Sequence, residues 1–206
     1  MKIIEQSCEW IQKPNLPLET IEKAARTCYK SEDKITKGSA EKIVKMLKNR
    51  GHHAMLEFNN AIVKFITNRG VTHELVRHRL CSFAQESTRY VNYNSKDMEF
   101  IRPVWWNDKA KLDAYEAQHY WENAMLDAEK YYNDLIKWGW KPQQAREVLP
   151  NSLKTEICVN ANLREWMHVF KLRTSKAAHP QIRELMKDCL KMFKEEIPIL
   201  FDDIED

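Results

Sequence analysis

The most informative stretch of this chain is RHRLCSFAQESTRY, residues 77–90. It contains no glycine that could form a phosphate-cradling loop, and it gathers guanidinium, imidazole and hydroxyl groups at Arg77, His78, Arg79, Ser87 and Arg89. Each guanidinium offers five donors in a rigid fork, so such a cluster is typical of a site for an anionic, planar ligand. Spacing alone leaves a second interpretation open, in which the arginines form a solvated face paired with Glu74 and Glu86.

The composition indicates one globular domain over residues 1–206, because this length suffices to bury a core. Charged residues make up 31% of the chain, yet the formal net charge is only +3. A general nucleic-acid coat would carry a strong basic excess. We therefore expect a local anion site and no nucleic-acid partner.

The N-terminal sequence MKIIEQSCEW lacks the apolar core of a signal peptide, and no run approaches the length of a membrane span. The cysteines are scattered and odd in number, at Cys8, Cys28, Cys81, Cys158 and Cys189. Dispersed cysteines of this kind are typical of reduced thiols. The expectation is a cytoplasmic protein with no membrane partner.

Hydrophobic periodicity and capping residues predict an α/β (α+β) fold, helix-rich with a small β-sheet. Helices are expected over Leu18–Tyr29, from Ser39 as a cap to Gly51, over Thr72–Leu80 with Thr72 as cap after a turn at Gly70, over Asp108–Trp138, from Pro142 to before Pro150, over Leu163–Arg173 with Asn162 as cap, and from Pro180 to about Ile197. Extended segments are expected over Asn60–Thr67, Arg89–Tyr93 and Leu153–Asn160.

On the expected helix, Glu74, Arg77 and His78 would share one face, with Arg79 pointing elsewhere. In an extended segment Ser87 and Arg89 would face the same way, and a hydroxyl beside a guanidinium suits a phosphate monoester. The run therefore predicts a motif that serves two ligands.

Other site classes fit the sequence less well. His73 and Glu74 begin a near match to the HExxH zinc motif, but Arg77 stands at the second histidine and cannot ligate a metal. His52 and His53 with Glu57 offer a partial ligand set, so a metal-dependent hydrolase is one alternative. No GxGxxG or GxxxxGK[ST] motif occurs, which excludes a Rossmann nucleotide site and a P-loop.

A second polar concentration contains Asn160, Asn162, Arg164, His168 and Arg173. His168 lies between apolar neighbours, and an ordinary partly buried histidine is an alternative interpretation. A further alternative for the whole chain is a non-catalytic nucleotide-binding or RNA-binding protein that uses the arginines with Tyr90 and Tyr93.

The signature RHR, seven residues, then Ser, one residue and Arg resembles that of the flavin-dependent thymidylate synthases. The resemblance extends over roughly residues 20–185, through HHAMLEF (His52 to Phe58), AREVLP with Arg146, and NLREWMHVFKLR with Asn162, His168 and Arg173. It implies an enzyme that methylates dUMP to dTMP for dTTP biosynthesis. The carbon donor would be 5,10-methylenetetrahydrofolate, and FAD reduced by NADPH would carry the hydride. It also implies a homotetramer with active sites shared between subunits.

By that resemblance the FAD contacts would be Ala54, Glu57, Arg77, His78, Arg79, Leu80, Asn162 and His168. The dUMP contacts would be Glu74, Arg77, Gln85, Glu86, Ser87, Thr88, Arg89, Arg146 and Arg173, with Ser87 and Arg89 on the phosphate.

The resemblance also implies that Arg173 is the catalytic residue, which favours the ionised uracil N3. A permanent cation lowers the pKa of a nearby acid, so the chemistry agrees with that role. Ionisation makes C5 more electron-rich, and no cysteine nucleophile is then needed, so Cys81 is interpreted as packing. No metal is expected. Ala84 stands where many family members carry asparagine, which predicts weaker or differently positioned flavin.

Overall fold

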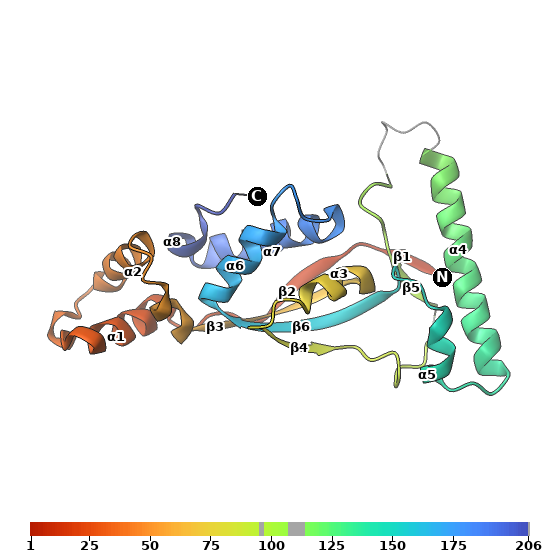
Figure 1. The fold of residues 1–206 in the computed structure, drawn as a ribbon, viewed down its shortest axis with the longest axis horizontal. Coiled ribbons are helices and arrows are strands. Elements are labelled where there is room, and N and C mark those ends of the chain that lie inside the picture. Colours follow the sequence, from red (N-terminus) through yellow and green to blue (C-terminus); the bar gives the residue numbers. More distant parts are fainter. Residues whose placement is uncertain (95–96, 107–113, 206) are drawn as a thin grey trace. The chain divides into compact units, whose positions relative to one another are not determined.

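The computed structural model describes residues 1–94, 97–106 and 114–205. Its α-helices are α1 (Pro17–Tyr29), α2 (Ser39–Asn49), α3 (Arg69–Leu75), α4 (Ala114–Lys137), α5 (Pro142–Ala145), α6 (Leu163–Arg173), α7 (Pro180–Glu196) and α8 (Pro198–Phe201) (Figure 1). Short 3-10 helices are η1 (Glu32–Lys34), η2 (His53–Phe58) and η3 (Arg146–Val148). The strands are β1 (Lys2–Ile4), β2 (Ser7–Gln12), β3 (Asn60–Asn68), β4 (Ser82–Gln85), β5 (Glu99–Ile101) and β6 (Lys154–Asn162). This mixture confirms the predicted helix-rich α/β class.

The strands form two sheets. β1 and β5 pair in parallel, with Ile3 opposite Phe100, and the larger sheet has the order β2-β3-β6-β4. In β3 and β6 the burial alternates residue by residue, as the side-chain period of a strand requires. Both strands confirm the predictions over Asn60–Thr67, made from its β-branched and apolar residues, and over Leu153–Asn160, with bounds that differ by one or two residues.

Residue contacts divide the chain into two compact units. Unit 1 comprises Met1–Ser7, Phe65–Arg77 and Ala84–Ile157, and unit 2 comprises Cys8–Lys64, His78–Phe83 and Cys158–Asp206. That residues 1–206 fold as one domain stays a prediction.

Unit 1 has a core between α4 and the segments beside β5. Its buried residues are Met98, Phe100, Met125, Tyr132, Ala145 and Leu153. The Tyr132 ring lies edge-on to Tyr93, with 5.9 Å between centroids. The long helix was predicted from Asp108, and residues 108–113 lie outside the described part of the chain.

Unit 2 packs α1 against α2, α2 against α8, and α6 against both α7 and η2. An aromatic cluster fills its core. The centroid of the Phe193 ring lies within 5.0 Å of the centroids of four other rings: Trp10, Trp166, Phe170 and Phe201. These rings anchor α6, the helix that carries the second polar concentration.

The start of α3 differs from the prediction. The N-cap is Asn68, whose side chain accepts a hydrogen bond from Val71 N at 2.8 Å, and Thr72 lies inside the helix. Gly70 does not turn the chain but occupies the first turn, where a Cβ would lie 3.3 Å from Asn68 Oδ1. The glycine therefore leaves room for the cap, and its low helix propensity was misleading.

The helix also ends earlier than predicted, at Leu75, so Arg77, His78 and Arg79 follow it in turns. The prediction that Glu74, Arg77 and His78 share one helical face was therefore wrong, because Arg77 and His78 lie outside the helix. The short strand β4 was not predicted.

The start of α2 also differs from the prediction. Ser39 is the first residue of the helix and Gly38 is its N-cap, while the Ser39 hydroxyl accepts a hydrogen bond from Thr36 N at 2.9 Å.

Candidate active site

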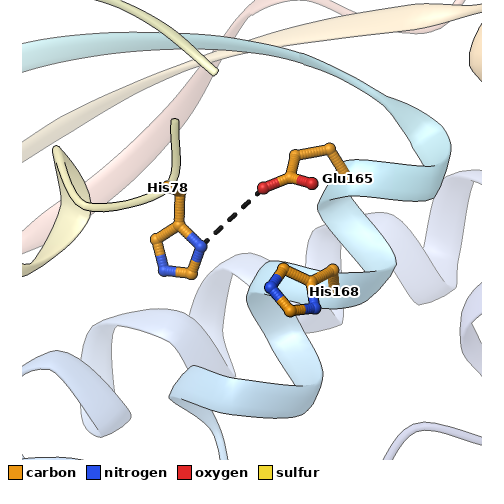
Figure 2. A group of neighbouring side chains, drawn as sticks. All are labelled: His78, Glu165 and His168. Carbon is orange, nitrogen blue, oxygen red and sulfur yellow. Dashed lines mark ion pairs between the residues drawn. The ribbon is translucent and has the colours of Figure 1, made fainter. Parts of the chain in front are cut away.

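The imidazole of His78 lies at the centre of a polar cluster in unit 2 (Figure 2). The side chain is buried, at 6% exposure. Arg173 Nε donates a hydrogen bond to His78 Nε2 at 3.0 Å, and Glu165 Oε1 lies 3.8 Å from Nδ1. Arginine Nε can only donate, so Nε2 must carry a lone pair and the proton of a neutral ring resides on Nδ1.

Burial and charge set the ionisation of this cluster. The pKa of His78 is lowered to about 4, first by burial and then by the positive charges of Arg173 and His168. Burial raises the pKa of Glu165, and His168 and Arg164 oppose that rise. His78 is therefore neutral at pH 7.

The thiol of Cys81 faces a similar environment. Its pKa is raised to about 12, first by burial and then by the negative charge of Glu165. Reactive cysteines are thiolates, so Cys81 is unsuited to be a nucleophile near neutral pH.

Helix α6 supplies three side chains of the polar cluster around His78: Glu165, His168 and Arg173. Asn162, the last residue of β6, caps it by accepting from Glu165 N at 2.8 Å, which confirms the predicted cap. Glu165 and His168 are three residues apart and therefore share a face of the helix. Trp166 points into the core and donates from Nε1 to Ala61 O at 3.2 Å. The strand, cap and buried indole together fix the first turn of α6.

A cavity of about 420 Å³ opens beside this cluster, within unit 2. Four residues predicted as FAD contacts line it: Glu57, Leu80, Asn162 and His168. Arg164, which the sequence indicated only as part of the second polar concentration, also lines it, as does Glu165, which the sequence reasoning missed. Arg164 Nη1 pairs with Glu57 Oε1 at 2.5 Å across the lining. The sequence did hold a signal for Glu165, because it stands three residues after a capping asparagine and three before His168.

The remaining predicted FAD contacts do not line this cavity. Ala54, in η2, and Arg79, in the turn before β4, are exposed. Arg77 is the last residue of its segment of unit 1 and is also exposed. Their assignment to FAD stays a prediction from the resemblance.

The predicted dUMP contacts, Arg173 apart, lie in unit 1. Arg146 Nη1 donates to Thr88 Oγ1 at 3.5 Å, which brings two of them together. Gln85 Nε2 donates instead to the hydroxyls of Thr72 and Thr155, at 3.0 and 3.3 Å. The Gln85 side chain thus braces β4 from within the unit. Glu74 is half-buried on α3.

A turn follows Ser87, over residues 88–90, so the predicted extended run is wrong at Arg89 and Tyr90. Residues 91–93 belong to no strand. The carbonyl of Ser87 accepts from Tyr90 N and Val91 N, at 3.2 and 3.0 Å, and its hydroxyl accepts from Arg89 N at 3.3 Å. The turn leaves Arg89 exposed, with its guanidinium carbon 5.5 Å from the Tyr90 ring centroid. Ser87 and Arg89 are therefore joined by turn geometry and not by strand alternation.

Glu86 is held by residues that the sequence did not indicate. Tyr93 donates its hydroxyl proton to Glu86 Oε1 at 2.9 Å, and Lys154 Nζ lies 3.6 Å from Glu86 Oε2. Burial and the Glu86 charge raise the pKa of Tyr93. The interpretation of Glu86 as a partner of the arginines on a solvated face finds no support in these contacts.

The arrangement bears on metal binding. Among the described residues, one group could bring three ligand atoms together, within 4.8 Å of one another: His78, Glu165 and His168. His52 and His53 belong to no such group in that part of the chain, and His53 Nε2 lies 3.4 Å from Lys48 O. A cation at His78 would have to displace either the Nδ1 proton or the Arg173 contact, and the guanidinium would repel it. The geometry therefore favours a hydrogen-bonding role for this cluster.

No helix in the described part of the chain combines the length and apolar character that a membrane span requires.

Comparison with known proteins places these residues in context. Residues 10–199 match the family model described as thymidylate synthase complementing protein. A flavin-dependent thymidylate synthase of Corynebacterium aurimucosum is 35% identical over 197 residues, covering 89% of this chain and 78% of that protein. The enzyme of the same name from Pyrococcus abyssi is 34% identical, covering 82% of this chain and 71% of that protein.

Among solved structures, a UMP/dUMP methylase, PolB, from Streptomyces cacaoi bound with 5-Br dUMP matches with a TM-score of 0.84. The match covers 98% of this chain and 96% of that one at 22% identity. At this identity the likeness concerns the fold, and it confirms the fold expected from the resemblance.

Proposed function

This chain belongs to the thymidylate synthase complementing protein family, and we propose that it catalyses the reductive methylation of dUMP to dTMP. The carbon donor is 5,10-methylenetetrahydrofolate, and FAD, reduced by NADPH, carries the hydride. The product would feed dTTP biosynthesis. The observation that carries the proposal is the Arg173–His78 contact beside a cavity that four predicted FAD residues line.

The cavity residues fit a flavin. A volume of about 420 Å³ lies within the usual range for cofactor pockets, roughly 300–1,000 Å³. Asn162, Arg164 and His168 offer hydrogen-bond donors, and exposed Leu80 offers an apolar surface for a ring. The chemistry that FAD supplies when bound is hydride transfer. The part of this chain is to orient the cofactor and to keep neutral His78 beside it.

The dUMP phosphate would be held by the turn at Ser87, with Arg89 as the cation and Thr88 and Arg146 next to it. Charge-assisted contacts of this kind are the strong ones in phosphate recognition. Glu74, Arg77, Gln85 and Glu86 complete the proposed nucleotide contacts. For Gln85 we propose a backbone contact, because its amide is engaged inside unit 1.

Arg173 would act on the uracil ring. A guanidinium stays protonated at any physiological pH and lowers the pKa of a nearby acid, so it favours the N3 anion and raises electron density at C5. Cys81 is a thiol with a pKa of about 12, which agrees with a mechanism that needs no cysteine nucleophile.

We further propose a cytoplasmic homotetramer in which a neighbouring subunit completes the phosphate site. Size-exclusion chromatography with light scattering tests the assembly.

One experiment tests the activity most directly. Purified protein should be yellow and release FAD on denaturation. Protein supplied with NADPH and the folate should release tritium from C5-labelled dUMP. A colourless preparation that also fails to bind added FAD would contradict the proposal. Polynucleotide binding with a steep salt dependence would instead support the RNA-binding alternative.

A further inference from the structure

We propose that Glu165 is a positioning residue: its carboxylate holds His78 in the Nδ1–H tautomer, and His78 thereby holds the guanidinium of Arg173 in its working orientation. The inference rests on the proposed function, because the action of Arg173 on the uracil belongs to that proposal. It concerns a residue to which the family resemblance assigned no role.

The first step is the direction of the hydrogen bonds. Arg173 Nε has one proton, and it points to His78 Nε2 at 3.0 Å. A neutral ring has one N–H, which must then be on Nδ1. This is the nitrogen that faces Glu165 Oε1 in Figure 2, at 3.8 Å. That distance exceeds a direct hydrogen bond, so the carboxylate acts as a charge facing the N–H dipole.

The second step is the alternative tautomer. If the proton moved to Nε2, this N–H would face the N–H of Arg173, donor against donor, and the contact would open. His78 and Glu165 are each 6% exposed, so solvent screens their interaction weakly. A negative charge on the Nδ1 side therefore favours the tautomer that keeps Arg173 bound to the ring.

The third step is the position of Glu165 in α6. It is the third residue of the helix, from which a glutamate commonly reaches back to the N-cap backbone to close a capping box. Here the Asn162 side chain accepts from Glu165 N, while the Glu165 carboxylate lies at His78. Capping alone thus leaves the direction of this side chain unexplained.

The experiment compares Glu165→Gln with Glu195→Gln, which removes the same charge from an exposed position of α7 in the same unit. Glu165→Gln should lower kcat for dUMP methylation by roughly 10- to 100-fold, by analogy with the loss of a carboxylate that orients a metal-ligating histidine. The KM for dUMP should change less than twofold. Because Glu165 also lines the cavity, any fall in FAD content should be by a much smaller factor than the fall in kcat, and kcat is therefore expressed per bound FAD. Glu165→Asp should recover part of kcat, and Glu195→Gln should match the wild type.

A second measurement reads the tautomer without any turnover. In the wild type, nitrogen-15 NMR of the His78 ring should show a protonated Nδ1 and an unprotonated Nε2. In Glu165→Gln the nitrogen-15 chemical shifts of Nδ1 and Nε2 should move toward each other, because both tautomers are then populated. The Glu195→Gln spectrum should match the wild type.

Three results would overturn the inference: an Nε2–H ring in the wild type, an unchanged kcat and spectrum in Glu165→Gln, or a loss of FAD in proportion to kcat. If Glu165→Gln fails to fold, the wild-type spectrum and the kcat of Glu165→Asp decide whether Glu165 positions His78. If the wild-type protein binds FAD and does not methylate dUMP, the proposed function fails, while the spectrum still reports on the tautomer.

Discussion

Single side chains in unit 2 derive their chemistry from partners far away in the sequence. His78 would titrate near pH 6.5 in an unfolded chain, and its pKa falls to about 4 because it is buried beside Arg173. The two residues are separated by 95 positions in the chain. The signature contains His78, and the resemblance at NLREWMHVFKLR indicates Arg173. Their contact, and the presence of Glu165 on the other side of the ring, follow from how α6 packs.

Arg173→Ala should lower kcat by a factor on the order of 10²–10³ while FAD stays bound, because the variant removes the cation proposed to act on the uracil and leaves the cavity lining intact. This factor is the usual cost of losing one preorganised electrostatic group. Stopped-flow flavin oxidation and FAD content measure the two effects. Loss of FAD with normal dUMP binding would contradict the role assigned to Arg173.

Arg89→Ala should weaken dUMP binding by about 1.5–3 kcal/mol, the usual range for a hydrogen bond to a charged group. Isothermal titration with dUMP measures this, and Arg50→Ala, at an exposed position of unit 2, serves as the control. An unchanged affinity for dUMP would show that Arg89 does not contact the phosphate.

Stability should depend on pH through His78. Between pH 6.5 and about 4 the unfolded chain binds a proton at this residue and the folded chain does not, so the free energy of unfolding falls as pH falls. Above pH 6.5 His78 contributes no pH dependence. Urea unfolding of the wild type and His78→Gln should therefore give curves that converge as the pH drops through this window. Parallel curves would mean that the pKa of His78 is not lowered.

At the scale of elements, the two helices that follow long strands begin in the same way. Asn68 ends β3 and caps α3, and Asn162 ends β6 and caps α6, each by accepting a backbone N–H at 2.8 Å. The sequence revealed the second cap because an apolar helical pattern follows it. The cap at Asn68 was not predicted, because Gly70 was interpreted as a turn. The absence of a Cβ at Gly70 in fact leaves room for the Asn68 side chain.

The two caps provide a matched pair of variants. Asn162→Ala and Asn68→Ala should each lower the free energy of unfolding by about 0.5–2 kcal/mol, the usual value of an N-cap. Of the two variants, Asn162→Ala alone should also weaken FAD binding, because Asn162 lines the cavity and Asn68 does not. Chemical denaturation and FAD titration separate the two effects, and equal FAD affinities would remove Asn162 from the cofactor site.

At the scale of the whole molecule, each unit has its own core, and the cavity belongs to unit 2. Phe193→Ala should cost about 3–5 kcal/mol, because it empties the centre of the aromatic cluster. Trp138→Ala should stay within about 0.5 kcal/mol, since that ring is 84% exposed. Denaturant unfolding followed by circular dichroism measures both. A small effect at Phe193 would mean that the cluster does not stabilise unit 2.

The sequence by itself determined the fold class, the helices with a clear apolar period, the two long strands, the family, and four of the six residues that line the candidate cavity. These depend on local periodicity, capping and a signature whose spacing survives without coordinates. Tertiary structure alone decided that Arg77–Arg79 lie in turns, that Tyr93 and Lys154 hold Glu86, and that Glu165 faces His78. The physical reason is that a buried group owes its tautomer and its pKa to the charges and burial that packing brings to it, and these come from distant parts of the chain.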